Sequence, residues 1–284
     1  MLNLGVAGLA GGGVYALIGV CLVLSYRVGA VVNFSQTFAA TLAVFVMSEL
    51  YDKDWNLWLA IGVAILFGAA LAGAQGWIMA KLFSDASVLV RSTVTIGMAI
   101  SLFGITVRIF HDTLRNFPSL FSSVKVTIGD VVVTGAVMAS LVGAIGISLA
   151  LWLALTKTRL GVILRAVSSR PTTAELMGVR TTRLVVLVWA VAGALTTAAL
   201  VLVAPSRRNI PNLALLVIPG LAAAVFGAMK SFSLTVVGGL LIGMVESMAL
   251  NWGTLGDYRP AISFVLITMA LLWSQRRETW GEAR

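Results

Sequence analysis

Few side chains in this sequence could do chemistry, and they do not form a catalytic set. The 284 residues include one histidine, His111, and one cysteine, Cys21. A nucleophile activated by a neighbouring base needs both groups within hydrogen-bond reach, and a histidine or cysteine metal centre needs several such ligands. The sequence has no plausible Ser/His/Asp or Cys/His combination and no paired carboxylates in its apolar segments. We therefore expect no catalytic residues, no bound metal and no enzymatic activity in this chain, which leaves binding and movement.

One acidic residue, Glu246, lies well inside an apolar run. Polar groups within a bilayer are costly, and they usually face a partner or a cavity. Three roles fit this glutamate: contact with a solute, an ion pair with an arginine such as Arg108 or Arg259, or a position at the membrane interface. The residues alone leave these three alternatives open.

Uncharged polar side chains also interrupt the apolar stretches. Asn33 and Gln36 fall near the start of one stretch, and Thr95 lies within another. Interrupted helices line the solute sites of many carriers. The alternative is a helix that simply begins later, near Thr37. Asn33, Gln36 and Thr95, together with Glu246, are our candidates for a solute pathway.

The segment 156–183 differs from its apolar surroundings because it is polar and well punctuated. Pro171 suits the first position of a helix, where its missing N–H would have no partner. Glu175 would favour the positive end of the helix dipole, and Gly178 suits the residue that follows a helix. We therefore predict a short helix over 171–177, which needs a partner surface because two turns are not stable alone in water.

This segment is also basic. Its positively charged residues are Lys157, Arg159, Arg165, Arg170, Arg180 and Arg183. It could be an ordinary basic loop whose arginines face anionic lipid. It could equally be a docking helix in which Ala174, Leu176 and Met177 supply apolar contacts. Both interpretations fit the residues.

The composition shows which elements must position these side chains. Hydrophobic residues make up 59% of the chain and charged residues 11%, whereas soluble domains carry about 25% charged residues. This predicts an all-α polytopic membrane protein with a single transmembrane domain over 1–284. The net charge of +9 is typical of lysine and arginine retained on the cytoplasmic side of a membrane rather than of nucleic-acid binding.

Apolar runs long enough to cross a bilayer number about nine, with eight to ten possible, since a spanning helix needs about 20 residues. The predicted spans are 5–25, 31–50, 57–80, 91–110, 132–155, 184–204, 213–230, 232–250 and 260–274. The pair on either side of Lys230 could instead be a hairpin of shorter helices. Small residues that favour close helix packing recur in three spans, at Gly8, Gly11, Gly12 and Gly13; at Gly68, Ala72 and Gly76; and at Gly238, Gly239 and Gly243.

The distribution of lysine and arginine predicts the orientation. Nine spans place the two termini on opposite sides, and more basic residues fall on the side that holds the C-terminus and the segment 156–183. Basic loops are retained in the cytoplasm. We therefore expect an external N-terminus, a cytoplasmic C-terminus and a cytoplasmic 156–183 segment.

Four segments, in order along nearly the whole chain, resemble one family. They are GGGVYALIGVCLVLSYRVGAVVNFSQ (11–36), STVTIGMAISL (92–102), RLGVILRAVSSRPTTAELMGV (159–179) and GLAAAVFGAMKSFSLTVVGGLLIGMVESM (220–248). They are similar to the opening, the Thr-Ile-Gly span, the cytoplasmic loop and the glycine-rich late spans of permease subunits of branched-chain amino acid ABC importers, of the LivH type. Members commonly carry His-Gly-Glu after the Asn-Phe pair, where this chain has Ser35-Gln36-Thr37, and this departure widens the expected solutes to other amino acids and small carboxylates or amides.

The resemblance implies a set of partners. These are a second, related permease subunit in a heterodimer, two cytoplasmic ATPases that bind ATP and magnesium, and an extracytoplasmic solute-binding protein, in the inner membrane of a bacterium. It also implies that the short helix docks on an ATPase, with Arg165, Arg170, Pro171, Glu175 and Gly178 shaping the coupling loop. No cofactor is expected in this chain itself. The alternative is an autonomous ion-coupled transporter or channel, which would need intramembrane charges such as Glu246.

Overall fold

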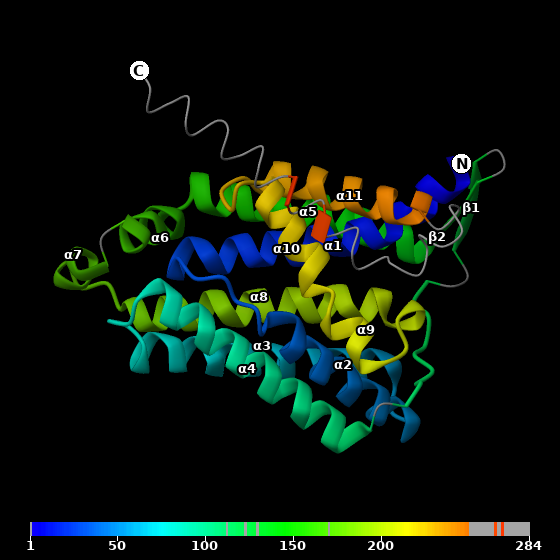
Figure 1. Ribbon diagram of the computed structural model, residues 1–284, viewed down its shortest axis with the longest axis horizontal. Helices are drawn as coiled ribbons and strands as arrows, with labels where there is room; N and C mark the ends of the chain where they lie inside the picture. The colour runs from blue at the N-terminus through cyan, green and yellow to red at the C-terminus, as the bar shows by residue number, and fades with distance from the viewer. Residues whose placement is uncertain are drawn as a thin grey trace. The chain divides into compact units, whose positions relative to one another are not determined.

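The computed structural model describes residues 2–111, 113–121, 124–128, 131–169, 171–249, 264–265 and 268–269 (Figure 1). The chain clusters into two compact units, which are described separately. The first unit comprises Met1–Val23, Leu120–Leu149 and Ile218–Arg284, and the second comprises Leu24–Ser119 and Ala150–Val217. Helices α1 and α5 each contribute residues to both units.

Helices dominate the described residues. They are α1 (Leu2–Gly29), α2 (Gln36–Asp52), α3 (Leu57–Leu82), α4 (Val88–Phe110), α5 (Gly135–Lys157), α6 (Arg159–Ser169), α7 (Pro171–Leu176), α8 (Thr181–Val203), α9 (Ile210–Ala214), α10 (Val217–Phe226) and α11 (Phe232–Ala249), with a 3₁₀ turn at Ala204–Ser206. Local capping sets two of the starts, because Asn56 accepts a hydrogen bond from the Trp58 N–H at 2.9 Å and Ser87 accepts one from the Val90 N–H at 3.3 Å. Such side chains satisfy N–H groups that the first turn of a helix leaves without a partner.

Six helices within the described residues are long and apolar enough to cross a membrane, so the protein is a multi-pass membrane protein. They cover Gly11–Gly29, Leu57–Leu82, Val88–Phe110, Gly135–Lys157, Thr181–Ser206 and Phe232–Ala249. Helix α2 has 17 residues, and the predicted span 213–230 is instead divided between the short helices α9 and α10. Most of the predicted span 260–274 lies outside the described residues, so the total of nine spans and the orientation of the termini stay predictions.

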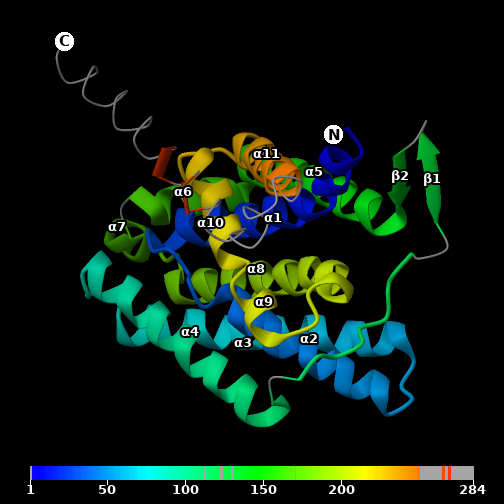
Figure 2. The same ribbon diagram turned by 45° about the vertical axis from the view of Figure 1, so that its right-hand side comes forward.

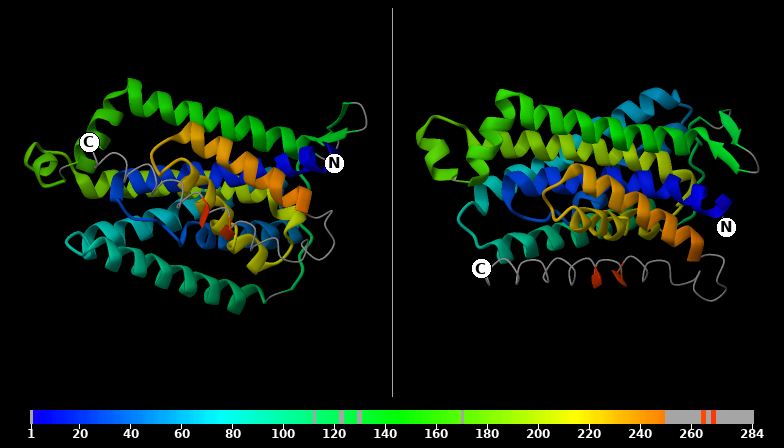
Figure 3. Two further views of the ribbon diagram at one scale, coloured as in Figure 1. Left: turned by 45° about the horizontal axis from the view of Figure 1, so that its top comes forward. Right: turned by 90° about the horizontal axis from the view of Figure 1, so that it is seen from above.

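In the first unit, α1 packs closely against α11, as the views in Figure 3 show. Glycines permit this approach. A Cβ atom added at Gly243 would lie 2.4 Å from the Gly12 Cα, and one added at Gly239 would lie 2.6 Å from the Ala16 Cα. On another side of α1, a Cβ at Gly13 would lie 2.7 Å from the Ser140 hydroxyl of α5. The small residues singled out in the sequence therefore bring helix backbones together, as small residues do in membrane proteins.

The first unit also contains a β-hairpin that the all-α prediction missed. Strands β1 (Lys125–Ile128) and β2 (Val131–Thr134) pair antiparallel, with Lys125 opposite Thr134 and Ile128 opposite Val131 (Figure 2). The β-branched run Val131–Thr134 favours a strand. Helix α5 therefore begins at Gly135, three residues after the start of the predicted span at 132.

In the second unit, α3 and α8 pack along much of their length, and α2 lies beside both α3 and α4 (Figure 1). Close approach between α3 and α8 again depends on glycine. A Cβ at Gly193 would lie 2.3 Å from the Ala72 Cβ, and one at Gly76 would lie 2.8 Å from the Trp189 Cβ. Trp189 is 2% exposed and belongs to an apolar cluster with Val31 and Met79. This packing positions the polar side chains described next.

Candidate functional site

The connection between α1 and α2 is a short non-helical segment with buried polar side chains. Helix α1 ends at Gly29, and Ala30 follows in the left-handed region with φ 50°. Asn33 is 1% exposed, and its Oδ1 accepts hydrogen bonds from the Ser35 N–H at 3.1 Å and the Ser35 hydroxyl at 2.7 Å. Helix α2 then begins at Gln36, which agrees with the alternative of a helix that begins late.

Gln36 joins three helices of the second unit. Its Nε2 donates to the Thr196 hydroxyl of α8 at 2.6 Å, and its Oε1 accepts from the Ser25 hydroxyl of α1 at 3.4 Å. All three side chains are fully buried. Next along α2, the Thr37 hydroxyl donates to the Ala214 carbonyl at 2.8 Å. The first turn of α2 is therefore held to α1, α8 and α9 by polar contacts.

Thr95 connects α4 to the same non-helical segment. Its hydroxyl lies 3.0 Å from the Val32 carbonyl and 2.8 Å from the Ser92 carbonyl, and it accepts from the Phe34 N–H at 3.4 Å. Thr95 is fully buried. The structure thus brings together three of the four predicted pathway residues, Asn33, Gln36 and Thr95. We call this group, with Ser25 and Thr196, the Gln36 network.

The Gln36 network consists of neutral amide and hydroxyl groups. Buried groups of this kind cost free energy unless they are hydrogen-bonded. In this structure Asn33, Gln36 and Thr95 each form hydrogen bonds with protein atoms. The network can offer a solute both donors and acceptors, but no compensating charge.

The fourth predicted residue, Glu246, belongs to the other unit. The Tyr15 hydroxyl of α1 donates to Glu246 Oε2 of α11 at 2.7 Å, and the two side chains are 1% and 4% exposed. Sequence reasoning missed Tyr15 because 231 positions separate the two residues. The signal was a tyrosine hydroxyl in an apolar helix, which requires a partner once buried. Glu246 belongs to the first unit, whereas the residues of the Gln36 network belong to the second.

The predicted coupling segment is helical on both sides of residue 170. Helix α6 carries Arg165, whose Nη1 donates to the Leu155 carbonyl near the end of α5. This bond satisfies a carbonyl in the last turn of α5, where basic side chains are favoured. Pro171 is the first residue of α7, as predicted from the sequence. Arg170 lies outside the described residues.

Helix α7 ends in a Schellman motif around Gly178. The Gly178 N–H donates to the Glu175 carbonyl at 2.9 Å, and the Val179 N–H donates to the Ala174 carbonyl at 3.0 Å. Gly178 has φ 84°, a left-handed conformation that glycine adopts without steric penalty. The helix runs over Pro171–Leu176, one residue shorter than the range 171–177 expected from the sequence.

The expected role of Glu175 at the positive end of the helix dipole is wrong. Glu175 is the fifth of the six residues of α7, and α7 has no acidic residue in its first turn. Its carboxylate instead accepts a hydrogen bond from the Thr181 hydroxyl, which begins α8. Glu175 therefore connects α7 to α8. Sequence reasoning missed Thr181 because the turn at Gly178 decides which side chain reaches the carboxylate.

The apolar residues near the end of α7 and directly after it differ in exposure. Ala174 is 3% exposed, whereas Leu176 is 90% and Met177 is 81% exposed. Two neighbouring large apolar side chains at this exposure form a small apolar patch on a polar segment. Among the described residues, no group of three or more His, Cys, Asp or Glu side chains could hold a metal ion.

Comparison with known proteins identifies the family. A family model described as the permease component of a branched-chain amino acid transport system matches residues 5–272. The chain belongs to this family. The match includes the Gln36 network, the Tyr15–Glu246 pair and the segment that contains α6 and α7, so each lies within the region that the family model covers.

Among solved structures, the chain is similar to PsaBC from Streptococcus pneumoniae in complex with Fab. The sequence identity is 14% and the TM-score is 0.49, over 95% of this chain and 90% of that chain. None of the curated proteins compared with this sequence matches it.

Proposed function

We propose that this chain is a transmembrane subunit of an ATP-binding-cassette importer and that it moves a small solute inward by alternating access. The observation that carries the proposal is membership of the family of branched-chain amino acid permease components over residues 5–272. The solute class is a branched-chain or other amino acid, or a related small carboxylate or amide. The protein would lie in the inner membrane of a bacterium, with the N-terminus outside and the C-terminus in the cytoplasm.

The energy would come from partners. A second, related permease would complete the pathway as a heterodimer, two cytoplasmic ATPases would bind ATP and magnesium, and an extracytoplasmic binding protein would deliver the solute. In this proposal α7 docks on an ATPase. The exposed Leu176 and Met177 support that role, because burying two large apolar side chains contributes about 3–6 kcal/mol to a contact.

The contacts of α7 provide a physical route from the ATPase to the solute pathway. Glu175 bonds to Thr181 at the start of α8, and Gly178 fixes the turn between the two helices. Helix α8 continues without interruption to Thr196, which bonds to Gln36. The 15 intervening residue steps correspond to about 22 Å of helix. A displacement of α7 would therefore reach the Gln36 network through a rigid element, as in other rigid-body transitions.

The docking surface is tested by Leu176→Ser and Met177→Ser in the reconstituted complex with its ATPases and binding protein. Because both side chains are exposed, these changes should leave the thermal stability of the permease unaltered. We expect solute-stimulated ATP hydrolysis and uptake to fall by about tenfold or more, since the lost apolar contact stabilises docking. Leu114→Ser is the matched control, because Leu114 is 78% exposed and lies on the predicted external side.

The turn is tested by Gly178→Pro and Glu175→Lys. Proline cannot adopt a φ of 84° and removes the N–H that donates to the Glu175 carbonyl. Lysine at 175 removes the acceptor for Thr181. Both should uncouple ATP hydrolysis from uptake while the spanning helices remain folded. Unchanged coupling in both variants would contradict the role of α7, and transport by this chain alone, driven by an ion gradient and indifferent to ATP, would contradict the importer itself.

A further inference from the structure

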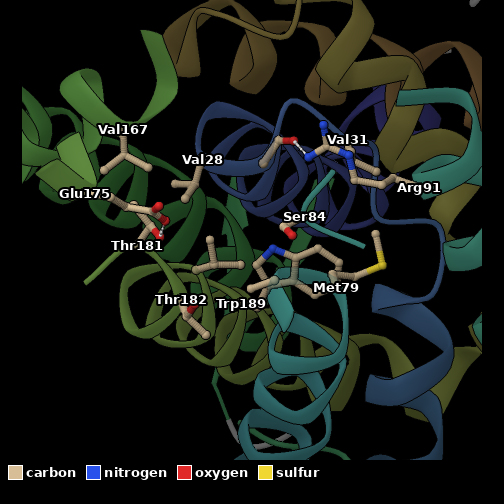
Figure 4. A pocket seen from close by; sticks show the side chains of 13 residues that line it. Val28, Val31, Met79, Ser84, Arg91, Val167, Glu175, Thr181, Thr182 and Trp189 are labelled. Atoms are coloured by element: carbon tan, nitrogen blue, oxygen red, sulfur yellow. Dashed lines mark hydrogen bonds between the residues drawn. The ribbon is translucent and has the colours of Figure 1, made fainter. Parts of the chain in front are cut away.

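A second polar site lies in the second unit, beside the coupling segment and apart from the Gln36 network. It is a cavity of about 170 Å³ between the end of α1, the end of α3, the start of α4, α6, α7 and the start of α8 (Figure 4). The side chains that give it chemical character are Ser84, Arg91, Glu175, Thr181, Thr182 and Trp189. Residues from distant parts of the sequence therefore converge on one small space.

One side of this cavity supplies hydrogen-bond donors. The Trp189 Nε1 is buried and has no hydrogen-bond partner among the described residues, although Trp189 is 2% exposed. Figure 4 shows its indole nitrogen facing the interior of the pocket. Arg91 donates from Nε to the Ala86 carbonyl at 3.0 Å and from Nη1 to the Gly29 carbonyl at 3.3 Å. These two bonds fix the plane of a guanidinium that has five N–H donors in total.

The other side of the cavity supplies an anionic acceptor. Glu175 and Thr181 lie across the pocket from Arg91 in Figure 4, and the Thr181 hydroxyl donates to the Glu175 carboxylate. That hydrogen bond uses one acceptor site of a carboxylate that has about four. Positive charge at one end and negative charge at the other suit a ligand that carries both charges in the opposite order.

The wall between the two charged ends is apolar. It is formed by Val28, Val31, Met79, Val167 and Val185, together with the ring of Trp189. Apolar walls with a few placed polar groups are typical of small-molecule sites. An indole N–H that is buried without an acceptor is itself destabilising, and a ligand oxygen would satisfy it.

We propose that this cavity binds an α-amino acid with an apolar side chain. The ligand carboxylate would accept from the Trp189 N–H and the Arg91 guanidinium, its ammonium group would contact Glu175, and its side chain would lie against the valines and Met79. None of the Gln36-network residues lines the cavity, so this site is distinct from that network.

The consequence of binding rests on the proposed function. If segment 156–183 faces the cytoplasm, the pocket opens on the side where imported solute accumulates. A bound amino acid would connect Glu175 of α7 to Arg91 of α4, and it would hold α7 in its present position. The imported product would therefore slow its own uptake by restraining the helix that docks on the ATPase.

Binding is measured on the full chain in nanodiscs made of phosphatidylglycerol, so that the lipid contributes no ammonium group. The probes are L-leucine, 4-methylpentanoate, which lacks the amine, and isopentylamine, which lacks the carboxylate. We expect L-leucine to bind and each single-charge analogue to bind about tenfold more weakly or worse, since a hydrogen bond to a charged group is worth about 1.5–3 kcal/mol.

Three variants locate the binding. Glu175→Gln should weaken the binding of L-leucine by about tenfold and leave the binding of 4-methylpentanoate unchanged, because only the ammonium group loses its partner. Trp189→Phe removes one neutral donor. It should weaken the binding of both ligands that carry a carboxylate, L-leucine and 4-methylpentanoate, by about threefold to tenfold. Arg91→Gln should weaken them further. Asp85→Asn, a charge removal at an exposed position next to Ser84 that does not line the cavity, should have no effect.

Several outcomes would overturn the proposal. These are no binding of L-leucine at millimolar concentration, equal binding of the single-charge analogues, equal effects of Glu175→Gln and Asp85→Asn, and tighter binding of glycerophosphoethanolamine, which would indicate a lipid headgroup. Because binding is measured without ATPases, its result is independent of the importer proposal. ATP-driven uptake without leucine binding would contradict only the proposed amino acid site. Leucine binding without ATP-driven uptake would contradict only the proposed importer function.

Discussion

The Gln36 network of the second unit and the Tyr15–Glu246 pair of the first unit satisfy buried polar groups in different ways. The network joins amide and hydroxyl groups from α1, α2, α4 and α8, with several bonds of 2.6–3.4 Å. The pair joins an ionisable carboxyl of α11 to a phenol of α1 through one bond of 2.7 Å. The network is neutral and connects many elements, whereas the pair contains a carboxyl group and connects two.

This difference indicates which part of the protein is rigid and which part can move. Around the pair, α1 and α11 approach so closely that glycine backbones touch, and such packing has few alternative arrangements. The Gln36 network instead includes the connection between α1 and α2, whose residues 31–34 lie outside both helices. We therefore expect residues 30–35 to rearrange during transport and the closely packed α1–α11 pair to stay fixed.

The change with the largest expected effect tests the close packing of α1 against α11. Gly243→Ala should destabilise the protein by about 3 kcal/mol, because the new Cβ would lie 2.4 Å from backbone atoms of Gly12 that cannot move independently. Gly97→Ala is the control, since nothing lies within 4 Å of a Cβ at that position of α4. Thermal unfolding in detergent measures both. Equal stability of the two variants would show that α1 and α11 are not rigidly packed.

Removing the centre of the network should have the next largest effect. Gln36→Leu leaves the buried Thr196 and Ser25 hydroxyls without their amide partner, and we expect a loss of about 2 kcal/mol. The double variant Gln36→Leu/Thr196→Val should lose less than the sum of the two single changes, because the pair is removed together. Additive losses in unfolding measurements would mean that the two side chains do not interact.

Tyr15→Phe should cost about 1.5 kcal/mol, since it removes one donor to a buried carboxyl group that has further interactions. The same change made in a Glu246→Gln background should cost less, because an amide accepts more weakly than a carboxylate. If the pair is only a support, uptake per folded molecule stays constant in both variants. A fall in uptake without a fall in stability would instead place Glu246 on the solute pathway.

Thr95→Val should have the smallest effect, about 1 kcal/mol, because valine keeps the shape and removes one hydroxyl with its bonds to residues 32–34. This variant is informative because its apparent solute affinity can be compared with its stability. A change in apparent solute affinity beyond the loss of folded protein would identify residues 30–35 as part of the pathway. Thr93→Val, at an exposed position on the same helix, is the matched control and should alter neither quantity.

Much of the helical framework follows from local sequence. The starts of α3 at Leu57 and of α7 at Pro171 agree with the residues predicted, because Asn56 caps one helix and proline suits the first position of the other. Gly178 ends α7 in the predicted conformation for the same kind of reason. Apolar length also predicted the six spanning helices within the described residues.

The errors occur where distant residues decide the outcome. The sequence predicts a span from residue 132, where the structure has strand β2, because a β-branched apolar run suits either structure until its partner strand is known. The predicted span 213–230 became two short helices. The sequence predicts that the Glu175 carboxylate interacts with the dipole of its own helix, whereas it accepts a hydrogen bond from Thr181 beyond the turn.

By itself, the sequence determined that this is a multi-pass helical protein, that a short punctuated helix interrupts it, and which family it resembles. These properties depend on apolar length, on residues that start and stop helices, and on local motifs. Only the tertiary structure decided that Asn33, Gln36 and Thr95 meet, that Tyr15 bonds to Glu246, and that Arg91, Glu175 and Trp189 share one cavity. The physical reason is that a buried polar group requires a partner, but its own sequence neighbourhood does not say which distant helix supplies it.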